Sequence, residues 1–271
     1  MDEGAPLDAE AADAPRYRNA SLERAFRILE CFDEQGRELH LHEVCARTGL
    51  NKATVFRFLA VLRRLGYVEK DPATDGYALG YRLLQLAHRV DEYAALRRLV
   101  HPELLRLAAE VNETVHFARL HRDKVVYCDK VDTAHSLRMQ TAVGSAVDAH
   151  ATGIGKAILA YRPAAEIVRL YPGGRLATHS PNTITGVEAL LKVLAGVRSR
   201  GYALDDEEFE LGLRCVAAPV FDTRGEAVFA VSVSGPTVRV TDAMLDAATR
   251  TVVRTARRIQ AILYPTGMPE P

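Results

Sequence analysis

Residues 41–66 read LHEVCARTGLNKATVFRFLAVLRRLG, and this stretch decides the fold of the N-terminal part of the chain. Its apolar residues recur at spacings of three and four in two segments, which are interrupted at Gly49. Gly49 can adopt the positive φ that a tight turn between helices requires, and Asn51 suits the N-cap of the second helix. The stretch is therefore predicted to form a helix-turn-helix.

The second predicted helix carries basic residues on the side opposite its apolar stripe. With Val55 and Leu59 facing inward, the helical period places Arg57 and Arg64 on the outer face. Arginine and asparagine side chains hydrogen-bond base edges and phosphates. The residues predicted to contact DNA are Asn51, Lys52, Thr54, Arg57 and Arg64. Arg64 is expected on a phosphate and the others in the major groove, while a solvated face on an ordinary helical hairpin is the alternative interpretation.

The segments on either side of this motif predict the rest of a small domain. Residues 67–70 and 76–79 are short extended segments, and the turn-rich residues between them predict the hairpin of a wing. Before the motif, Ser21 is predicted to cap a helix with Leu22 and Phe26 on its apolar stripe. The order helix, helix, helix, hairpin is that of a winged helix-turn-helix domain, which we assign to residues 18–80.

Composition limits the class of protein. The 271 residues favour two domains, and Lys plus Arg balance Asp plus Glu at 35 each, so net charge says nothing about partners. Residues 1–17 are predicted to be a disordered acidic tail, because residues 1–15 hold five acids and no base and lack the features of a signal peptide. The sequence has no run of 18 apolar residues and four scattered cysteines. We therefore expect a soluble, cytoplasmic protein with no membrane partner.

The region after the wing is predicted to be helical and to connect two domains. Residues 81–100 read as a linker helix, and its apolar face, with Leu83, Leu86 and Val90, is a candidate dimer interface. Pro102 disfavours helix at the residue before it and suits the first turn of a new helix. A second domain is therefore assigned to residues 101–265.

The second domain mixes strands and helices, which predicts an α+β fold. Strands are predicted at residues 114–120, 124–130, 136–141, 213–221 and 227–234. Thr152 and Thr241 are predicted to begin helices, Thr185 to begin another through a capping box with Glu188, and Gly201 to end that helix.

Three segments of the chain resemble one family. They are GYVEKD…DGYALGYRLLQLA from Gly66, SLRMQTAVGSAVDAHATGIGKAILA from Ser136 and, above all, GYALDDEEFELGLRCVAAPVFD from Gly201. Over residues 18–264 the chain resembles IclR-type transcriptional regulators. The resemblance implies a C-terminal effector-binding domain related to GAF domains. It also implies dimers or tetramers that bind palindromic operators on double-stranded DNA.

The same resemblance implies a small-molecule pocket in the second domain. Ser232 and Ser234 share one face of a predicted strand, and an unpartnered buried hydroxyl costs about 1 to 3 kcal/mol, so both need partners. The positions that the resemblance assigns to the effector pocket are Met139, Gly153, Ile154, Asp205, Cys215, Ser232 and Ser234. Gly153 and Ile154 open a helix, and the free N–H groups and dipole of a helix start attract a carboxylate. A small organic acid is the effector class that this arrangement favours.

Two other functions compete with this interpretation. Cys215, His150 and Asp205 together resemble a thiol triad of a hydrolase, although a mid-strand cysteine among apolar residues is usually inert. A metal sensor would have only His40 and His42 at a suitable spacing, and a surface position is the simpler interpretation. We expect no catalytic residue, no metal and no cofactor. Effector identity and the choice between repressor and activator are left open.

Overall fold

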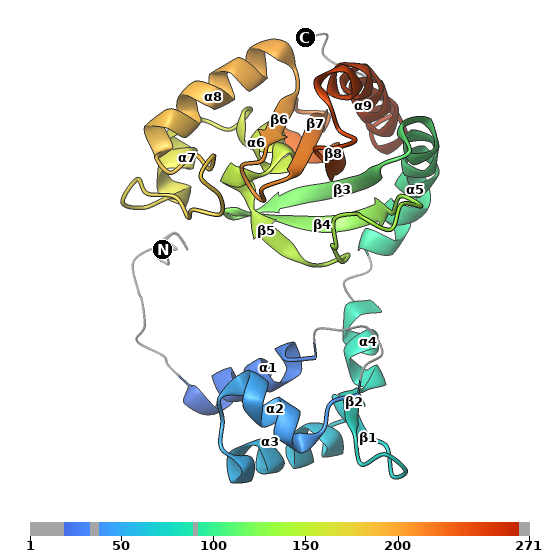
Figure 1. Cartoon of the computed structure of the whole chain (residues 1–271), viewed down its shortest axis with the longest axis vertical. Coiled ribbons are helices and arrows are strands. Elements are labelled where there is room, and N and C mark those ends of the chain that lie inside the picture. The colour runs from blue at the N-terminus through green and yellow to red at the C-terminus, as the bar shows by residue number, and fades with distance from the viewer. Residues whose placement is uncertain (1–18, 33–37, 89–91, 266–271) are drawn as a thin grey trace, which may run out of the picture. The chain divides into compact units, whose positions relative to one another are not determined.

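The chain falls into two compact units in its computed structural model, which describes residues 19–32, 38–88 and 92–265. The units are Met1–Asp91 and Glu92–Pro271 (Figure 1). The predicted acidic tail, residues 1–17, lies outside the described residues. Within those residues, no helix is long and apolar enough to cross a membrane.

The first unit has the predicted order of elements. They are α1 (Ala20–Glu30), α2 (Leu41–Thr48), α3 (Lys52–Arg64), β1 (Val68–Lys70), β2 (Tyr77–Leu79) and α4 (Tyr81–His88). Gly49 ends α2 with a φ of 69°, and the Asn51 side chain accepts the backbone N–H of Thr54 at 2.9 Å to cap α3. Strands β1 and β2 pair in antiparallel fashion, which forms the wing. The predicted helix-turn-helix is confirmed.

Helix α1 differs from its prediction in its cap and in its buried face. Its N-cap is Asn19, whose side chain accepts the backbone N–H groups of Ser21 and Leu22, so Ser21 is not the cap. Ile28 is the buried residue of this helix, whereas Leu22 and Phe26 are 57% and 54% exposed. Leu22 and Phe26 of the predicted apolar stripe therefore lie on the surface of this unit, whereas Leu29 packs against its core.

The second unit is an antiparallel sheet with helices on both faces, so the α+β fold class is confirmed (Figure 1). Its first elements are α5 (Glu92–Val111), β3 (Thr114–His121), β4 (Lys124–Val131), β5 (Ala146–Asp148), the 3-10 turn η1 (Ala149–Ala151) and α6 (Gly153–Leu159). The remaining elements are α7 (Ala164–Leu170), α8 (Val187–Arg200), β6 (Ala203–Asp206), β7 (Leu213–Phe221), β8 (Ala227–Pro236) and α9 (Asp242–Leu263). The strand order is β5-β4-β3-β8-β7-β6.

Two hydrophobic clusters, one on each face, hold the sheet. Helices α5 and α9 pack on one face, where Phe117, Val231 and Val252 are among the buried residues. Helices α6, α7 and α8 cover the other face, where Ala230 and Ile158 are buried. Side chains alternate between the two faces along β8, because successive residues of a strand point to opposite sides.

Helix α5 runs through Pro102 without a break, so the predicted new helix at this residue is wrong. Val100, Leu104 and Leu107 are fully buried on both sides of the proline, and α5 packs on α9, β3 and β4. The burial of these side chains offsets the backbone hydrogen bond that a proline removes.

Two other predicted boundaries are also corrected. Residues 136–141 form no strand, because the outer edge of β4 is already paired with β5. Side-chain contacts hold this segment instead, and the Arg239 guanidinium donates to the Leu137 carbonyl at 2.9 Å. Helix α8 is capped by Gly186 rather than by Thr185, whose carbonyl accepts the backbone N–H of Leu176. Gly201 ends α8 as predicted, with a φ of 80°.

Candidate functional site

The outer face of α3 is exposed where the sequence places DNA-contacting residues. Asn51, Lys52, Arg57 and Arg64 are exposed, and the opposite side of the helix is buried in the core of the unit. Thr54 is only 9% exposed, so its prediction as a base-contacting residue is corrected. It lies on the inner side of the first turn, where the cap from Asn51 fixes its backbone.

One exposed residue on the same helix was not predicted. Phe56 is 55% exposed and sits between the basic positions of α3. Apolar and aromatic side chains on a recognition helix can contact the methyl group of thymine. The apolar spacing that sets Phe58 inward leaves Phe56 off that stripe, and in the structure Phe58 is partly buried against the core of the unit.

The second unit brings the seven predicted pocket residues together. One cavity between α6 and the β6-β7-β8 part of the sheet is lined by Met139, Gly153, Ile154, Asp205, Cys215, Ser232 and Ser234. Tyr127, Thr152, Phe209 and Leu213 complete its wall and were not predicted. Tyr127 and Phe209 come from segments that no local pattern places beside β7, so only the tertiary structure identifies them.

The strand register explains why three of these side chains meet. Asp205 in β6 lies opposite Cys215 in β7, and Cys215 lies opposite Ser234 in β8. Residues that are directly opposite in neighbouring strands point to the same face. The sheet therefore presents a carboxyl, a thiol and a hydroxyl in one row, and Ser232 adds a second hydroxyl two residues along β8.

Helix α6 begins in close contact with this row. A Cβ on Gly153 would lie 3.0 Å from Sγ of Cys215, so glycine is what permits the approach. The Thr152 hydroxyl caps the helix by accepting the N–H of Gly155, rather than that of Gly153 or Ile154. Gly153 and Ile154, which carry the first two amides of α6, line the same cavity as the row of polar side chains on β6, β7 and β8.

The environment of Cys215 does not suit a nucleophile. Burial raises the pKa of its thiol to about 12, although hydrogen bonds with Ser234 and Ser232 act in the opposite direction. His150 is not part of the cavity wall, because it binds the Ala177 carbonyl at 2.9 Å and packs against Tyr171. The hypothetical thiol triad is therefore not assembled in this structure.

Asp205 is buried and held by backbone donors. Its Oδ1 accepts the N–H of Glu208 at 2.8 Å and that of Phe209 at 3.3 Å. Burial raises the pKa of the Asp205 carboxyl to about 7, while the nearby Lys156 ammonium and the two N–H groups act to lower it. Near neutral pH this carboxyl is consequently present in both its protonated and ionised forms.

A buried ion pair lies beside Asp205. Lys156 is 1% exposed, and its ammonium group binds the carboxylate of Glu208. The other carboxylate oxygen of Glu208, Oε2, has no hydrogen-bond partner in the described part of the chain. Lys156 therefore offsets the negative charge of a loop that would otherwise place two acidic groups close together.

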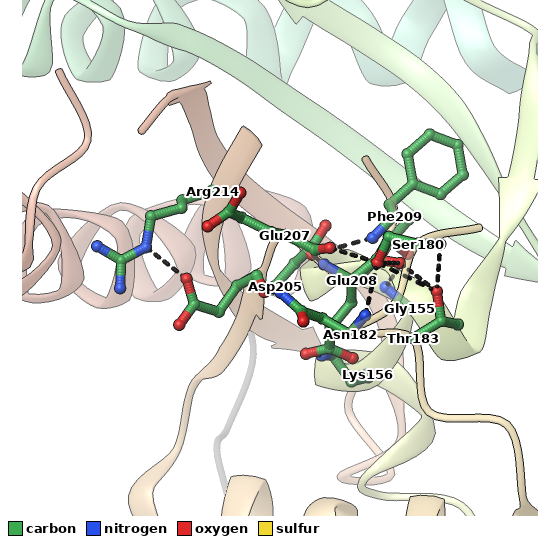
Figure 2. Close-up of polar contacts among 12 residues, drawn as sticks. Gly155, Lys156, Ser180, Asn182, Thr183, Asp205, Glu207, Glu208, Phe209 and Arg214 are labelled. Carbon is green, nitrogen blue, oxygen red and sulfur yellow. Dashed lines mark hydrogen bonds and ion pairs between the residues drawn. The ribbon is translucent and has the colours of Figure 1, made fainter. Parts of the chain in front are cut away.

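This loop is tied to a neighbouring segment (Figure 2). The Ser180 hydroxyl donates to the Glu207 carbonyl at 2.6 Å, and the Thr183 hydroxyl donates to the Glu208 carbonyl at 2.6 Å. Glu207 adopts a φ of 62°, a left-handed conformation that these bonds help to hold. The contacts fix the position of Phe209 in the cavity wall.

The cavity has almost no free space in this conformation. The space that can hold the centre of a water molecule is only about 10 Å³, which is enough for about one water. A ligand can enter only if part of the wall moves. Met139 comes from an irregular segment rather than from the sheet, whereas the loop that carries Phe209 is held by hydrogen bonds to Asp205, Ser180 and Thr183.

Both units match models of one protein family. The model of the bacterial transcriptional regulator IclR C-terminal region matches residues 88–261, and that of the IclR helix-turn-helix domain matches residues 21–72. The chain belongs to the IclR family of transcriptional regulators. An IclR-family chain combines a helix-turn-helix domain that binds DNA with a C-terminal domain that binds a ligand.

Individual relatives agree with this assignment. The chain is 36% identical over 242 residues to the HTH-type transcriptional regulator KdgR of Escherichia coli (strain K12), which covers 89% of this chain and 92% of KdgR. It is similar to the structure of IclR from Thermotoga maritima, with a TM-score of 0.74, 30% identity and coverage of 90% of this chain and 98% of that one. Such relatives are named as regulators, so this IclR-family chain is a regulator and not an enzyme.

A third structure shares the fold. It is an IclR homolog from Microbacterium hydrocarbonoxydans complexed with 4-hydroxybenzoate, with a TM-score of 0.75 and 22% identity, covering 91% of this chain and 100% of that chain.

Proposed function

We propose that this regulator binds a palindromic operator as a homodimer or tetramer, and that a small organic acid or related hydroxylated metabolite modulates its affinity for DNA. The observation that supports this function best is the cavity of the second unit. Seven residues from separate segments, all assigned to one pocket from the sequence, line it together. A cytoplasmic location, where the operator is accessible, follows from the same proposal.

Base reading is proposed for the first turns of α3. Lys52 and Arg57 are exposed there, and the Nδ2 group of Asn51 stays available to donate because its Oδ1 is the helix cap. Arg64, at the other end of α3, is proposed to bind a phosphate. Thr54 is left out of this set because its side chain is buried.

Exposed apolar side chains of the first unit support association of two subunits. On α4, Tyr81, Leu84 and Leu86 are 63%, 62% and 41% exposed, and Leu22 and Phe26 are exposed on α1. Of the other residues predicted for this interface, Leu83 is half-buried and Val90 lies outside the described residues. Surfaces of this kind mark protein interaction sites, and one helix-turn-helix reads only half of a palindrome.

The polar groups of the cavity fit an organic acid that carries a hydroxyl group. We assign its carboxylate to the amides of Gly153 and Ile154, and its other oxygens to Ser232, Ser234 and Asp205. Because the pKa of Asp205 is raised to about 7, this carboxyl can stay protonated and donate a hydrogen bond to an anionic ligand instead of repelling it. The 4-hydroxybenzoate in the Microbacterium structure is a ligand of this chemical class.

Ligand binding requires the cavity to enlarge. This conformational change is the step through which the ligand would alter the affinity for DNA. A ligand shifts DNA affinity only through its differential affinity for the two states of the protein, and such coupling is commonly about 1 to 3 kcal/mol. Movement of the irregular segment that carries Met139 is one change that would enlarge the cavity.

The experiment that tests the function has two parts. Selection of bound fragments from upstream DNA should return a palindromic sequence, and organic acids can then be screened for an effect on its binding. Replacement of Ser232 and Ser234 together by alanine should abolish the response to the active acid while leaving ligand-free operator binding unchanged. A double variant that responds at the same ligand concentrations as the parent would contradict the assigned pocket.

A further inference from the structure

A second region of the C-terminal unit contains two adjoining hollows, which are lined by the end of α8 and the C-terminal half of α9. The first is an open groove of about 620 Å³, and the second is a more enclosed cavity of about 530 Å³. Arg200, Val253 and Arg257 line both, so the groove and the cavity are continuous. Neither shares a residue with the proposed effector pocket. Both volumes are in the range of small-molecule sites.

The groove is strongly cationic. Its wall contains Arg250, Arg254, Arg257 and Arg258 of α9, which recur on one face of the helix, and Arg200 at the end of α8. The wall includes no acidic residue. Among the residues that the structure describes, only one of these five arginines forms an ion pair. It is Arg254, which binds the Glu110 carboxylate at 2.6 Å. The other four guanidinium groups are exposed and form no ion pair within the described residues, although the charge of Arg258 also acts on Glu110 and Arg200 donates to the Tyr202 carbonyl at 2.8 Å.

The adjoining cavity combines an apolar and aromatic part with polar and charged residues. Tyr161 and Phe221 meet edge to face with ring centroids 4.7 Å apart, and Pro219 and Val253 also line the wall. The Asp222 carboxylate in this wall is bound to Arg224 at 3.1 Å, so its charge is already offset. A ring or short acyl group fits against the apolar part of this wall, and the shared residues Arg200 and Arg257 lie where the cavity adjoins the groove.

We propose that this region is a second ligand site that takes an amphipathic organic phosphate. Its phosphate groups would bind Arg200 and Arg257 at the junction, with Arg250 and Arg258 beside them, because the planar guanidinium fork matches the geometry of phosphate oxygens. Its apolar part would enter the cavity next to Tyr161 and Phe221. The regulator then has two sites of different chemistry in one unit, one for an organic acid and one for an organic phosphate.

The test uses the full-length chain and two probes that represent the two halves of the ligand. Anilinonaphthalene sulfonate combines an aromatic ring system with an anion and fluoresces in apolar sites, and inorganic pyrophosphate carries only the anion. We expect pyrophosphate to displace the dye, and the double variant Arg200→Ala/Arg257→Ala to bind the dye at least about tenfold more weakly. Both arginines are exposed, so the variant should fold, which circular dichroism can check.

Two control variants separate this site from the rest of the surface. Arg169→Ala removes an exposed arginine of α7 outside the groove, and Ser232→Ala/Ser234→Ala alters the other pocket. Both should bind the dye with the affinity of the parent. Equal dye affinity of the parent and the Arg200→Ala/Arg257→Ala variant, or failure of pyrophosphate to compete, would overturn the proposal.

Two other occupants give different results. If deletion of residues 1–15 strengthens dye binding and the free acidic peptide weakens it, the groove holds the tail and the proposal is wrong. If Arg200→Ala/Arg257→Ala changes the mass of the protein in sedimentation, the groove is a contact between subunits, which also overturns it.

Discussion

The backbone N–H of Glu208 donates to Oδ1 of Asp205 across 2.8 Å, and so ties a buried carboxyl to the loop that carries Phe209. The bond does not keep Asp205 ionised, because burial raises its pKa from 3.8 to about 7 against the effect of this donor and of Lys156. Folding therefore changes the proton affinity of a group in the wall of the proposed pocket.

The first prediction concerns the pH dependence of stability. Between about pH 4 and pH 7 the folded chain retains a proton on Asp205 that the unfolded chain has lost, so this group lowers the free energy of unfolding as the pH rises. Urea denaturation should show that Asp205→Asn lacks this contribution and gains stability relative to the parent toward pH 7. The exposed variant Asp246→Asn serves as control. Parallel pH profiles of Asp205→Asn and the parent would contradict the expectation.

The second prediction concerns the buried ion pair. Lys156→Ala should lower the free energy of unfolding by about 3 to 5 kcal/mol, because it leaves the Glu208 carboxylate buried without a counter-charge. Glu208→Gln in the same chain should recover part of this loss. A double-mutant cycle from denaturation curves measures the coupling, and additive effects of the two substitutions would show that the pair contributes no interaction energy.

The third prediction separates two roles on α3. Arg57→Ala should weaken binding to the operator by about 1 to 3 kcal/mol and relax its sequence preference, if the guanidinium contacts a guanine. Arg64→Ala should weaken all DNA sequences alike and reduce the salt dependence of binding. Gel-shift titrations at several salt concentrations measure both. Unchanged operator affinity would remove Arg57 from the reading set.

The fourth prediction concerns the close contact of α6 and β7. Gly153→Ala places a Cβ 3.0 Å from Sγ of Cys215. We expect this contact to lower the free energy of unfolding by about 1 to 3 kcal/mol. Adding Cys215→Ala removes the clashing atom and should restore part of the loss, since the next neighbour, Cβ of Ala217, is 3.5 Å away. Thermal melts of the two variants decide the matter, and an equally low melting temperature for both would show that another atom causes the strain.

The fifth prediction concerns thiol reactivity. Burial raises the pKa of Cys215 to about 12, so little thiolate forms near pH 8, and a mild alkylator should label this residue more slowly than the half-buried Cys45. Peptide mapping by mass spectrometry gives the two rates. Rapid modification of Cys215 in the folded chain would revive the nucleophile hypothesis.

Local chemistry made several features predictable. The helix-turn-helix follows from the apolar spacing, from Gly49 at a positive φ and from the Asn51 cap, each of which depends only on residues a few positions away. The alternation of Ser232 and Ser234 with apolar residues likewise fixes which face of β8 is polar. The membership of the pocket came from the family resemblance rather than from local pattern.

The remaining features depended on distant parts of the chain. Pro102 stays inside α5 because Val100 and Leu104 are buried against other elements. Local helix propensity does not include the free energy of such tertiary contacts. The sequence determined most of the helices and strands, although not the irregular segment 136–141 or the continuation of α5 through Pro102. Only the tertiary structure decided that Tyr127 and Phe209 close the pocket, that Thr54 is hidden and that arginines of α8 and α9 share one groove, because burial and charge compensation are set by contacts between segments far apart in the chain.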